Sequence, residues 1–155
     1  MRHRIYFHIV WTTRDRAPLI DLPRAQFLSK YLTFVGAEER IQIWSLGIVA
    51  THLHLLVRTR PVIDLPWLVQ RFKGGSATVA AQQHIGDGQH PLRWAKGYNV
   101  QSVSHGAVLR VAHYVDQQSR RHPGDAISGW RGASTSHISA ACIGFAITER
   151  APERG

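Results

Sequence analysis

Two short segments of the sequence carry residue types that can break a phosphodiester bond. His52 and His54 flank one leucine in a largely apolar segment, residues 51–57, that favours a β-strand. Side chains two positions apart on a strand point to the same face, so both imidazoles can bind one metal ion. Tyr114 and Gln118 are four positions apart, which places them on the same side of a helix. If that helix lies against the strand, two nitrogen ligands, an amide oxygen ligand and a phenolic nucleophile surround one cation.

The histidine pair alone is a weak signal. Ten histidines in a chain of 155 residues produce one such pair by chance about as often as not. Two histidines held by ordinary hydrogen bonds are therefore the alternative interpretation. The oxygen of Gln118 adds a third ligand, and a mixed set of nitrogen and oxygen ligands with open positions favours Mg²⁺ or Mn²⁺ over a closed zinc site.

Tyr114 lies beside the apolar stripe of its expected helix rather than on it. A tyrosine on an amphipathic helix is more often a packing residue than a nucleophile. A phenol also needs nearby positive charge or a metal to become a nucleophile at neutral pH. Arg110 and Arg121 lie about one and two turns away on the same side of the helix, which favours the catalytic interpretation.

The composition indicates a polyanionic partner. The formal charge is +9, and sixteen of the nineteen basic residues are arginine, whose planar guanidinium suits phosphate. Cys142 is the only cysteine, which excludes an intramolecular disulfide. The apolar stretch near the start is too short for a signal peptide, and no apolar run reaches the length of a membrane span. We expect a cytoplasmic protein that does not contact a membrane.

Apolar periodicity predicts one domain in which strands alternate with helices. The expected strands cover residues 4–12, 41–49, 53–58 and 98–103, and the expected helices cover 24–37, 65–84 and 106–121. Gly74 and Gly75 are expected to interrupt or bend the second helix. The element order predicts an α+β, ferredoxin-like (split βαβ) fold, with an antiparallel sheet, helices mainly on one face and an extra C-terminal helix that carries Tyr114. Residues 1–122 would form this domain, and 123–155 a Gly- and Ser-containing tail of unknown role, with an apolar stretch at 138–147.

Further basic residues are candidates for contacts with nucleic acid. The candidates are Arg14, Arg16, Arg71, Lys73, Lys96, Arg110 and Arg121. Arg71 and Lys73 precede the two glycines, where solvated charges at a helix kink are an equally good interpretation. Trp94 could stack on a base, although a core position is the more common outcome for tryptophan. No glycine-rich nucleotide motif is present, so we expect no nucleotide cofactor.

Several separated blocks follow one another in an order typical of one family. The blocks are His8-Ile9-Val10-Trp11-Thr12-Thr13-Arg14, Thr51-His52-Leu53-His54-Leu55-Leu56-Val57, Phe72-Lys73-Gly74, Trp94-Ala95-Lys96-Gly97-Tyr98 and the helix of Tyr114. Over residues 3–122 the chain resembles the single-tyrosine HUH transposases. These comprise the insertion-sequence-200-like (IS200-like) enzymes and the transposases associated with repetitive extragenic palindromes (REP).

The resemblance implies a role for each residue of the first two segments. It makes His52, His54 and Gln118 ligands of Mg²⁺ or Mn²⁺ and Tyr114 the nucleophile that cleaves and rejoins single-stranded DNA through a 5′-phosphotyrosine intermediate. It further implies a hairpin-forming DNA partner and a homodimer whose active sites combine residues of both chains. One departure is Thr51, which stands where relatives commonly have Asn or Asp.

Two rival functions remain open at this point. The first is a non-catalytic, basic protein of split βαβ fold that binds single-stranded nucleic acid through aromatic residues of its sheet. It predicts that His52 and His54 face away from Tyr114. The second is a metal-binding or scaffold protein, which would explain the histidines but not the positive charge.

Overall fold

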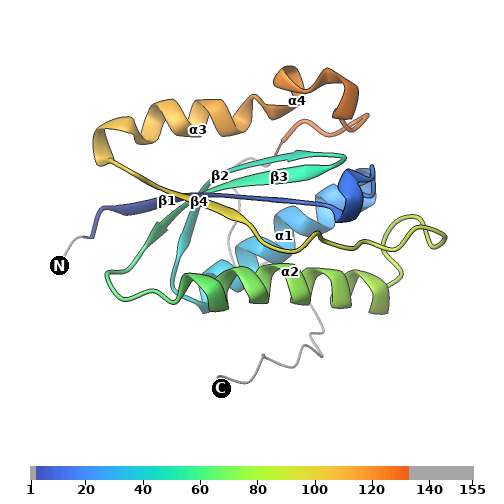
Figure 1. Cartoon of the computed structure of the whole chain (residues 1–155), viewed down its shortest axis with the longest axis horizontal. Helices are drawn as coiled ribbons and strands as arrows, with labels where there is room; N and C mark the ends of the chain where they lie inside the picture. The colour runs from blue at the N-terminus through green and yellow to red at the C-terminus, as the bar shows by residue number, and fades with distance from the viewer. Residues whose placement is uncertain (1–2, 133–155) are drawn as a thin grey trace.

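A computed structural model of the chain describes residues 3–132, and in this part an antiparallel sheet lies between two layers of helices (Figure 1). The strands are β1 (Ile5–Thr12), β2 (Gln42–Val49), β3 (His52–Thr59) and β4 (Asn99–Val103). The helices are α1 (Leu22–Glu38), α2 (Leu65–Gln82), α3 (Val108–Asp116) and α4 (Gln118–Arg121), with short 3₁₀ turns η1 (Arg14–Arg16), η2 (His105–Ala107) and η3 (Pro123–Asp125). The sheet order is β2-β3-β1-β4, with neighbouring strands antiparallel. This confirms the predicted α+β, split βαβ fold.

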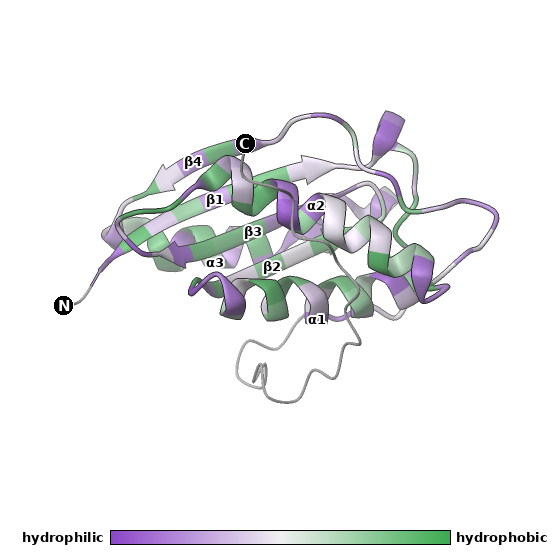
Figure 2. Ribbon diagram, turned by 90° about the horizontal axis from the view of Figure 1, so that it is seen from below, coloured by the Kyte–Doolittle hydropathy of each residue, from purple (hydrophilic) through white to green (hydrophobic). Residues whose placement is uncertain are grey.

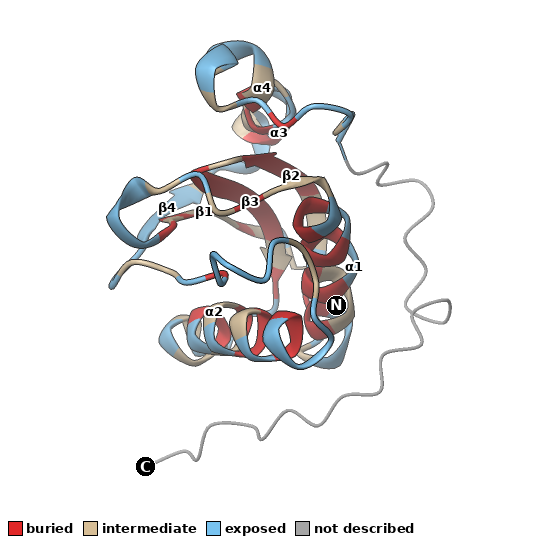
Figure 3. Cartoon of the chain, turned by 90° about the vertical axis from the view of Figure 1, so that its right-hand side faces the viewer, coloured by how far each residue is buried: buried red, intermediate tan, exposed pale blue. Residues whose placement is uncertain are grey.

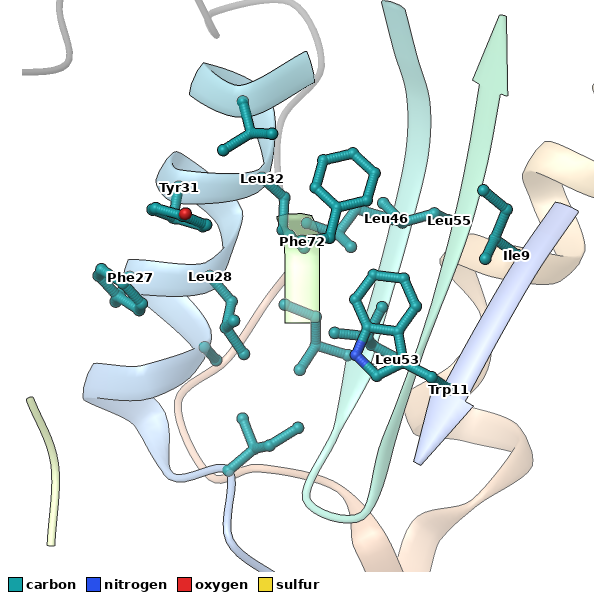
Figure 4. Close-up of a cluster of buried hydrophobic side chains, with 14 of the residues drawn as sticks. Ile9, Trp11, Phe27, Leu28, Tyr31, Leu32, Leu46, Leu53, Leu55 and Phe72 are labelled. Carbon is teal, nitrogen blue, oxygen red and sulfur yellow. The ribbon is translucent and has the colours of Figure 1, made fainter. Parts of the chain in front are cut away.

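The main hydrophobic core lies between the sheet and the layer formed by α1 and α2. Figure 2 views the molecule from the side of these two helices. Alternate residues of the central strands point to this face, namely Ile9 and Trp11 of β1 and Leu53 and Leu55 of β3, and they pack with Phe72 of α2 (Figure 4). The main core therefore contains every second side chain of each central strand, and the side chains between them point to the opposite face of the sheet.

Helix α2 runs from Leu65 to Gln82 without interruption. It starts where the Asp64 carboxylate accepts a hydrogen bond of 3.0 Å from the backbone N–H of Trp67. The expected interruption at Gly74 and Gly75 is wrong. Burial of one side of α2 against α1 and the sheet stabilises the helix, and this tertiary packing outweighs the low helix propensity of two glycines.

Helices α3 and α4 lie on the opposite face of the sheet (Figures 1 and 3). A second, smaller core holds α3 there and consists of Tyr6, Leu56, Val108 and Val115. The single helix expected over 106–121 is wrong in one respect, because the helix breaks at Gln117, where φ is −92° and ψ is 11°. The break changes the direction of the chain between the tyrosine and the glutamine of the expected site.

The described part of the expected tail packs on the domain. The backbone N–H of Ala50 donates to the carbonyl oxygen of Asp125 over 2.7 Å. Ile127 is buried in the main core, and Trp130 packs against it. The packed structure thus continues to about residue 130, beyond the boundary expected at 122, whereas Cys142 and the apolar stretch 138–147 lie outside the described residues. Within residues 3–132, no helix combines the length and apolarity that crossing a bilayer requires.

Candidate active site

The two histidines of β3 point to the face that α3 and α4 cover. β3 is a central strand, and its register places His52 opposite Thr12 and His54 opposite Val10 of β1. Both histidines are buried, and their ring centroids lie 5.2 Å apart. The sequence prediction that both imidazoles share one face is confirmed.

Tyr114 of α3 lies above this pair of histidines. Its ring centroid is 5.8 Å from that of His54 and 5.9 Å from that of His8. The guanidinium carbon of Arg121 lies 4.4 Å from the centre of the tyrosine ring, which is a cation–π contact. Val115 anchors α3 in the smaller core, so the adjacent Tyr114 is held at the edge of that core beside the histidines. The phenol and both imidazoles therefore converge within one chain.

Gln118 is the first residue of α4, directly after the break between α3 and α4. Its side chain is almost fully buried, and Nε2 donates a hydrogen bond of 3.1 Å to the carbonyl oxygen of Tyr114. Its Oε1 atom is buried and has no partner in hydrogen-bonding geometry within residues 3–132, although the side chain lies close enough to His52 to raise the pKa of that histidine. A buried acceptor without a partner costs about 1–3 kcal/mol. This oxygen is therefore suited to a ligand that the protein alone does not supply.

Gly47 of β2 allows the α3–α4 junction to approach the sheet. A Cβ atom at this position would lie 2.1 Å from the carbonyl oxygen of Val115 and 2.8 Å from Cγ of Gln118. Only glycine leaves room for the backbone at this distance. The sequence contains Gly47 as one residue of an ordinary strand, so its part in the site was not predicted.

Replacement of Gly47 with alanine is expected to displace the α3–α4 junction. The new methyl group would overlap backbone atoms that cannot rotate away, which we expect to lower the free energy of unfolding by about 1–3 kcal/mol. Gly74→Ala is the matched control, because a Cβ there meets no atom within 4 Å and alanine favours a helix. Chemical denaturation of both variants measures the difference. Equal stability of Gly47→Ala and the wild type would contradict the predicted close contact.

Hydrogen bonds occupy Nδ1 of both histidines. Nδ1 of His52 lies 3.0 Å from the hydroxyl oxygen of Thr51, and Nδ1 of His54 lies 2.9 Å from Nε2 of His8. In each ring, this leaves Nε2 as the nitrogen for a metal. His8 was missed as a member of the site. The sequence signal that could have identified it is its place two residues after Tyr6 in the first strand, because the two side chains point to the same face of the sheet.

Burial holds these histidines in the neutral form. It lowers the pKa values of His8, His52 and His54, and that of His54 falls to about 3 because positive charge on His8, His52 and His122 adds to the effect of burial. For His52, the charges of His122 and Arg16 also lower the pKa, while Asp125 and the side chain of Gln118 oppose the shift. A neutral imidazole keeps the lone pair that binds a metal at neutral pH.

The low pKa values predict a loss of stability in acid. The unfolded chain binds protons on these histidines near pH 6.5, whereas the folded protein binds one on His54 only near pH 3. Between these values the unfolded state holds more protons, so stability decreases as the pH falls. For the metal-free protein we expect a decrease on the order of a few kcal/mol. Urea melts at about pH 7.5 and about pH 4.5 test this, and an unchanged midpoint would contradict it.

The donor set fits a divalent cation with open coordination positions. Two imidazole nitrogens and the amide oxygen of Gln118 are a mixed set suited to Mg²⁺ or Mn²⁺, and the buried Oε1 without a partner is the observation that supports this fit. In the described range, no group of three His, Cys, Asp or Glu residues is arranged to hold a metal. A metal at this site would thus take its third protein ligand from Gln118.

Comparison with known proteins shows the family of the chain. Residues 1–118 match the family model described as "Transposase IS200 like". The chain belongs to the IS200-like transposase family. One relative of this transposase is the ISDra2 transposase TnpA of Deinococcus radiodurans, which is 23% identical over 119 residues, a match that covers 75% of this chain and 85% of the relative.

Two solved structures share the fold of the transposase. The crystal structure of a putative transposase from D. radiodurans R1 matches with a TM-score of 0.59 and 22% identity, over 76% of this chain and 93% of that one. The structure of a REP-associated tyrosine transposase bound to a REP hairpin matches with a TM-score of 0.62 and 16% identity, over 99% of this chain and 93% of that one. The family resemblance inferred from the sequence is confirmed.

Two basic residues of the transposase that we expected to contact nucleic acid have partners within the fold. The guanidinium of Arg71 bonds to the carboxylates of Glu38 and Glu39 and so joins α2 to the end of α1. Nζ of Lys73 donates to the carbonyl oxygens of Ala95 and Gly97 over 2.7 and 2.8 Å, and burial lowers the pKa of Lys73. These contacts give Arg71 and Lys73 structural roles, and a contact of either residue with DNA stays a prediction.

The remaining basic candidates are exposed. They are Arg14, Arg16, Lys96, Arg110 and Arg121. Arg14 and Lys96 border a shallow depression of 450 Å³ that Trp94 also lines. Nε1 of Trp94 donates to Oγ of Ser76 over 3.0 Å, and its ring packs edge-on against Trp11, so Trp94 belongs with the core, as the more common interpretation predicted.

Proposed function

We propose that this IS200-like transposase cleaves and rejoins single-stranded DNA through a 5′-phosphotyrosine intermediate with Mg²⁺ or Mn²⁺. The observation that carries the proposal is the convergence of Tyr114, His54 and Gln118 in one chain. The tyrosine ring lies 5.8 Å from the ring of His54, and the buried side chain of Gln118 donates to the carbonyl oxygen of Tyr114 and acts on His52. The family supports DNA as the substrate.

The chemistry of the first step requires a nucleophile and a way to offset negative charge. The phenolic oxygen of Tyr114 attacks the scissile phosphorus in line and loses its proton to solvent, while the bond to the 3′-oxygen of the upstream strand breaks and that oxygen takes a proton from solvent to become a hydroxyl group. A divalent cation held by His52, His54 and Gln118 would offset the charge that develops on the phosphate. Arg121 holds the tyrosine ring by its cation–π contact and adds positive charge at the same place.

The second step is the reverse of the first. The phosphotyrosine bond conserves the energy of the phosphodiester, so a 3′-hydroxyl of another strand can attack it and release Tyr114. No ATP or other nucleotide cofactor is required. The proposed site accordingly needs only the three candidate metal ligands and the phenol of Tyr114, and no nucleotide-binding loop.

A DNA strand is expected to reach this site along the exposed basic residues. The net charge of +9 supports salt-dependent binding to phosphate. Arg16 lies close enough to His52 to lower its pKa, and Arg110 projects from the outer side of α3. One structural neighbour is bound to a REP hairpin, which supports a hairpin-forming strand as the partner here.

A homodimer that combines active-site residues of two chains stays a prediction. In such a dimer, the tyrosine helix of one protomer would contribute Tyr114 to the active site of the other protomer. The contacts of Tyr114 with His8 and His54 of the same chain support a site that one protomer completes by itself. Mixing a Tyr114→Phe protomer with a His54→Ala protomer separates the two cases, because only shared sites would restore cleavage.

The proposal is tested by a denaturing gel of protein, Mn²⁺ and a labelled hairpin oligonucleotide. We expect a covalent protein–DNA adduct that retains a label at the 3′ end, because the tyrosine stays on the 5′ end of the downstream fragment. A label at the 5′ end should appear on a free product, and EDTA should prevent both. Hairpin binding without an adduct, with either Mg²⁺ or Mn²⁺, would contradict the proposal and favour the non-catalytic binding protein.

A further inference from the structure

A carboxylate outside the residues that match the family model is connected to His52 through hydrogen bonds. The family match ends at residue 118, whereas Asp125 lies in the turn η3. Oδ2 of Asp125 accepts a hydrogen bond of 3.2 Å from the hydroxyl group of Thr51. The same hydroxyl oxygen lies 3.0 Å from Nδ1 of His52. Asp125, Thr51 and His52 thus form a continuous chain of hydrogen bonds.

The backbone holds both ends of this chain in place. The carbonyl oxygen of Asp125 accepts from the N–H of Ala50 over 2.7 Å, and the N–H of Asp125 donates to the carbonyl oxygen of His122 over 3.0 Å. The carbonyl oxygen of Thr51 accepts from the N–H and the hydroxyl group of Thr13 over 2.8 and 3.0 Å. Thr51 and His52 are only 6% and 4% exposed, so water has little access to compete for these bonds.

The number of protons determines the direction of each hydrogen bond. An ionised carboxylate only accepts, and a hydroxyl group has one proton to donate. The proton of Thr51 therefore points to Asp125, which leaves the oxygen of Thr51 as an acceptor for His52. Nδ1 of His52 must then carry the proton of the neutral ring, and Nε2 keeps its lone pair.

We propose that Asp125 is a positioning residue that acts through Thr51 to hold His52 in the Nδ1–H tautomer, with Nε2 available to a divalent cation. Asp125 does not contact the cation or the DNA in this arrangement. The part that concerns the cation rests on the proposed function, whereas the tautomer of His52 does not. The groups that act on the ring of His52 are His54, His122, Arg16, Asp125 and the side chain of Gln118, and among the contacts of the described chain only the Thr51 hydroxyl lies at hydrogen-bond distance from Nδ1.

Nuclear magnetic resonance of the full-length, metal-free protein reads the tautomer directly. With ¹⁵N-labelled histidine, the signals of His52 are identified by their loss in His52→Gln, and the two nitrogen shifts report which atom carries the proton. We expect Nδ1–H in the wild type. In Asp125→Ala the Thr51 hydroxyl is free to donate to His52, so we expect the Nε2–H form to appear. A wild-type His52 with its proton on Nε2 would overturn the proposal.

Binding of Mn²⁺ measured by calorimetry without DNA gives the second readout. Loss of an outer partner of a metal ligand typically costs about 10- to 100-fold in affinity, and we expect a decrease of this size for Asp125→Ala and Thr51→Val. Thr51→Ser keeps the hydroxyl group and should bind Mn²⁺ like the wild type. Unchanged affinity and tautomer in both loss variants would overturn the proposal. If the wild-type protein cleaves DNA but His52 carries its proton on Nε2, the positioning role of Asp125 is wrong and the proposed function stands. If His52 carries its proton on Nδ1 but the protein forms no DNA adduct, the proposed function is wrong and the positioning role stands.

Discussion

Replacement of Tyr114 with phenylalanine is expected to abolish DNA cleavage and the covalent adduct. The substitution removes the phenolic oxygen, and loss of a nucleophile of this kind lowers the rate by at least about a thousandfold. The ring remains, so its contacts with His54 and with the guanidinium of Arg121 should persist. We therefore expect the affinity for a hairpin oligonucleotide to change little.

Cleavage under single-turnover conditions, and hairpin binding in EDTA, separate the two effects. Tyr98→Phe is a matched control, because Tyr98 is an exposed tyrosine whose ring is kept while its hydroxyl group is lost. This control should cleave like the wild type. If Tyr114→Phe still formed the adduct at the wild-type rate, another residue would have to be the nucleophile.

Replacement of His54 with alanine is the prediction with the second largest expected effect. The change removes one of the three proposed ligands and the ring nearest to Tyr114. We expect cleavage at a fixed Mn²⁺ concentration to fall by about a hundredfold or more. Higher Mn²⁺ should recover part of the activity if the remaining ligands still bind the cation weakly.

His113→Ala is the control for the loss of a histidine. His113 precedes Tyr114 in α3 but is exposed on the outer side of the helix, so its removal should leave the Mn²⁺ dependence unchanged. Calorimetric titration of both variants with Mn²⁺ measures the metal site without DNA. Equal Mn²⁺ affinity in His54→Ala and the wild type would show that His54 is not a ligand.

The sequence was sufficient to predict that His52 and His54 share one face of a strand. They lie two positions apart in an apolar segment, and the structure places Leu53 and Leu55, the residues of opposite parity, in the main core on the other face. This can be predicted from a short segment, because successive side chains of any strand point to opposite faces of the sheet, whatever packs on them. The order of elements then restricted the topology to a split βαβ sheet.

The break between Tyr114 and Gln118 could not be predicted in this way. Residues 106–121 have helical periodicity throughout, but the chain leaves the helix at Gln117 where it packs on β2. The space that makes this possible is provided by Gly47, which is distant in sequence. Helical spacing still identified a pair of residues that are in contact, since Nε2 of Gln118 donates to the carbonyl oxygen of Tyr114 although the helix is not continuous.

Long-range partners explain the other differences. Arg71 and Lys73 lie next to two glycines, as in a phosphate-binding cluster. In the fold, however, Arg71 pairs with carboxylates at the end of α1, and Lys73 donates to carbonyl oxygens of the segment before β4. In the same way, His8 and Asp125 join the histidine pair only because β1 pairs with β3 and η3 packs on the β2–β3 turn. Single-sequence patterns carry no information on such pairings.

The most direct test of the proposed chemistry identifies the residue that becomes linked to DNA. Arg110 and Arg120 flank Tyr114, so trypsin releases a peptide, residues 111–120, that contains one tyrosine and one serine. After reaction with a hairpin oligonucleotide and Mn²⁺ and digestion of the DNA, mass spectrometry should find a nucleotide attached through its 5′-phosphate to Tyr114. A nucleotide on Ser119 or on another peptide, or no modified peptide in a reaction that has cleaved the DNA, would contradict the account.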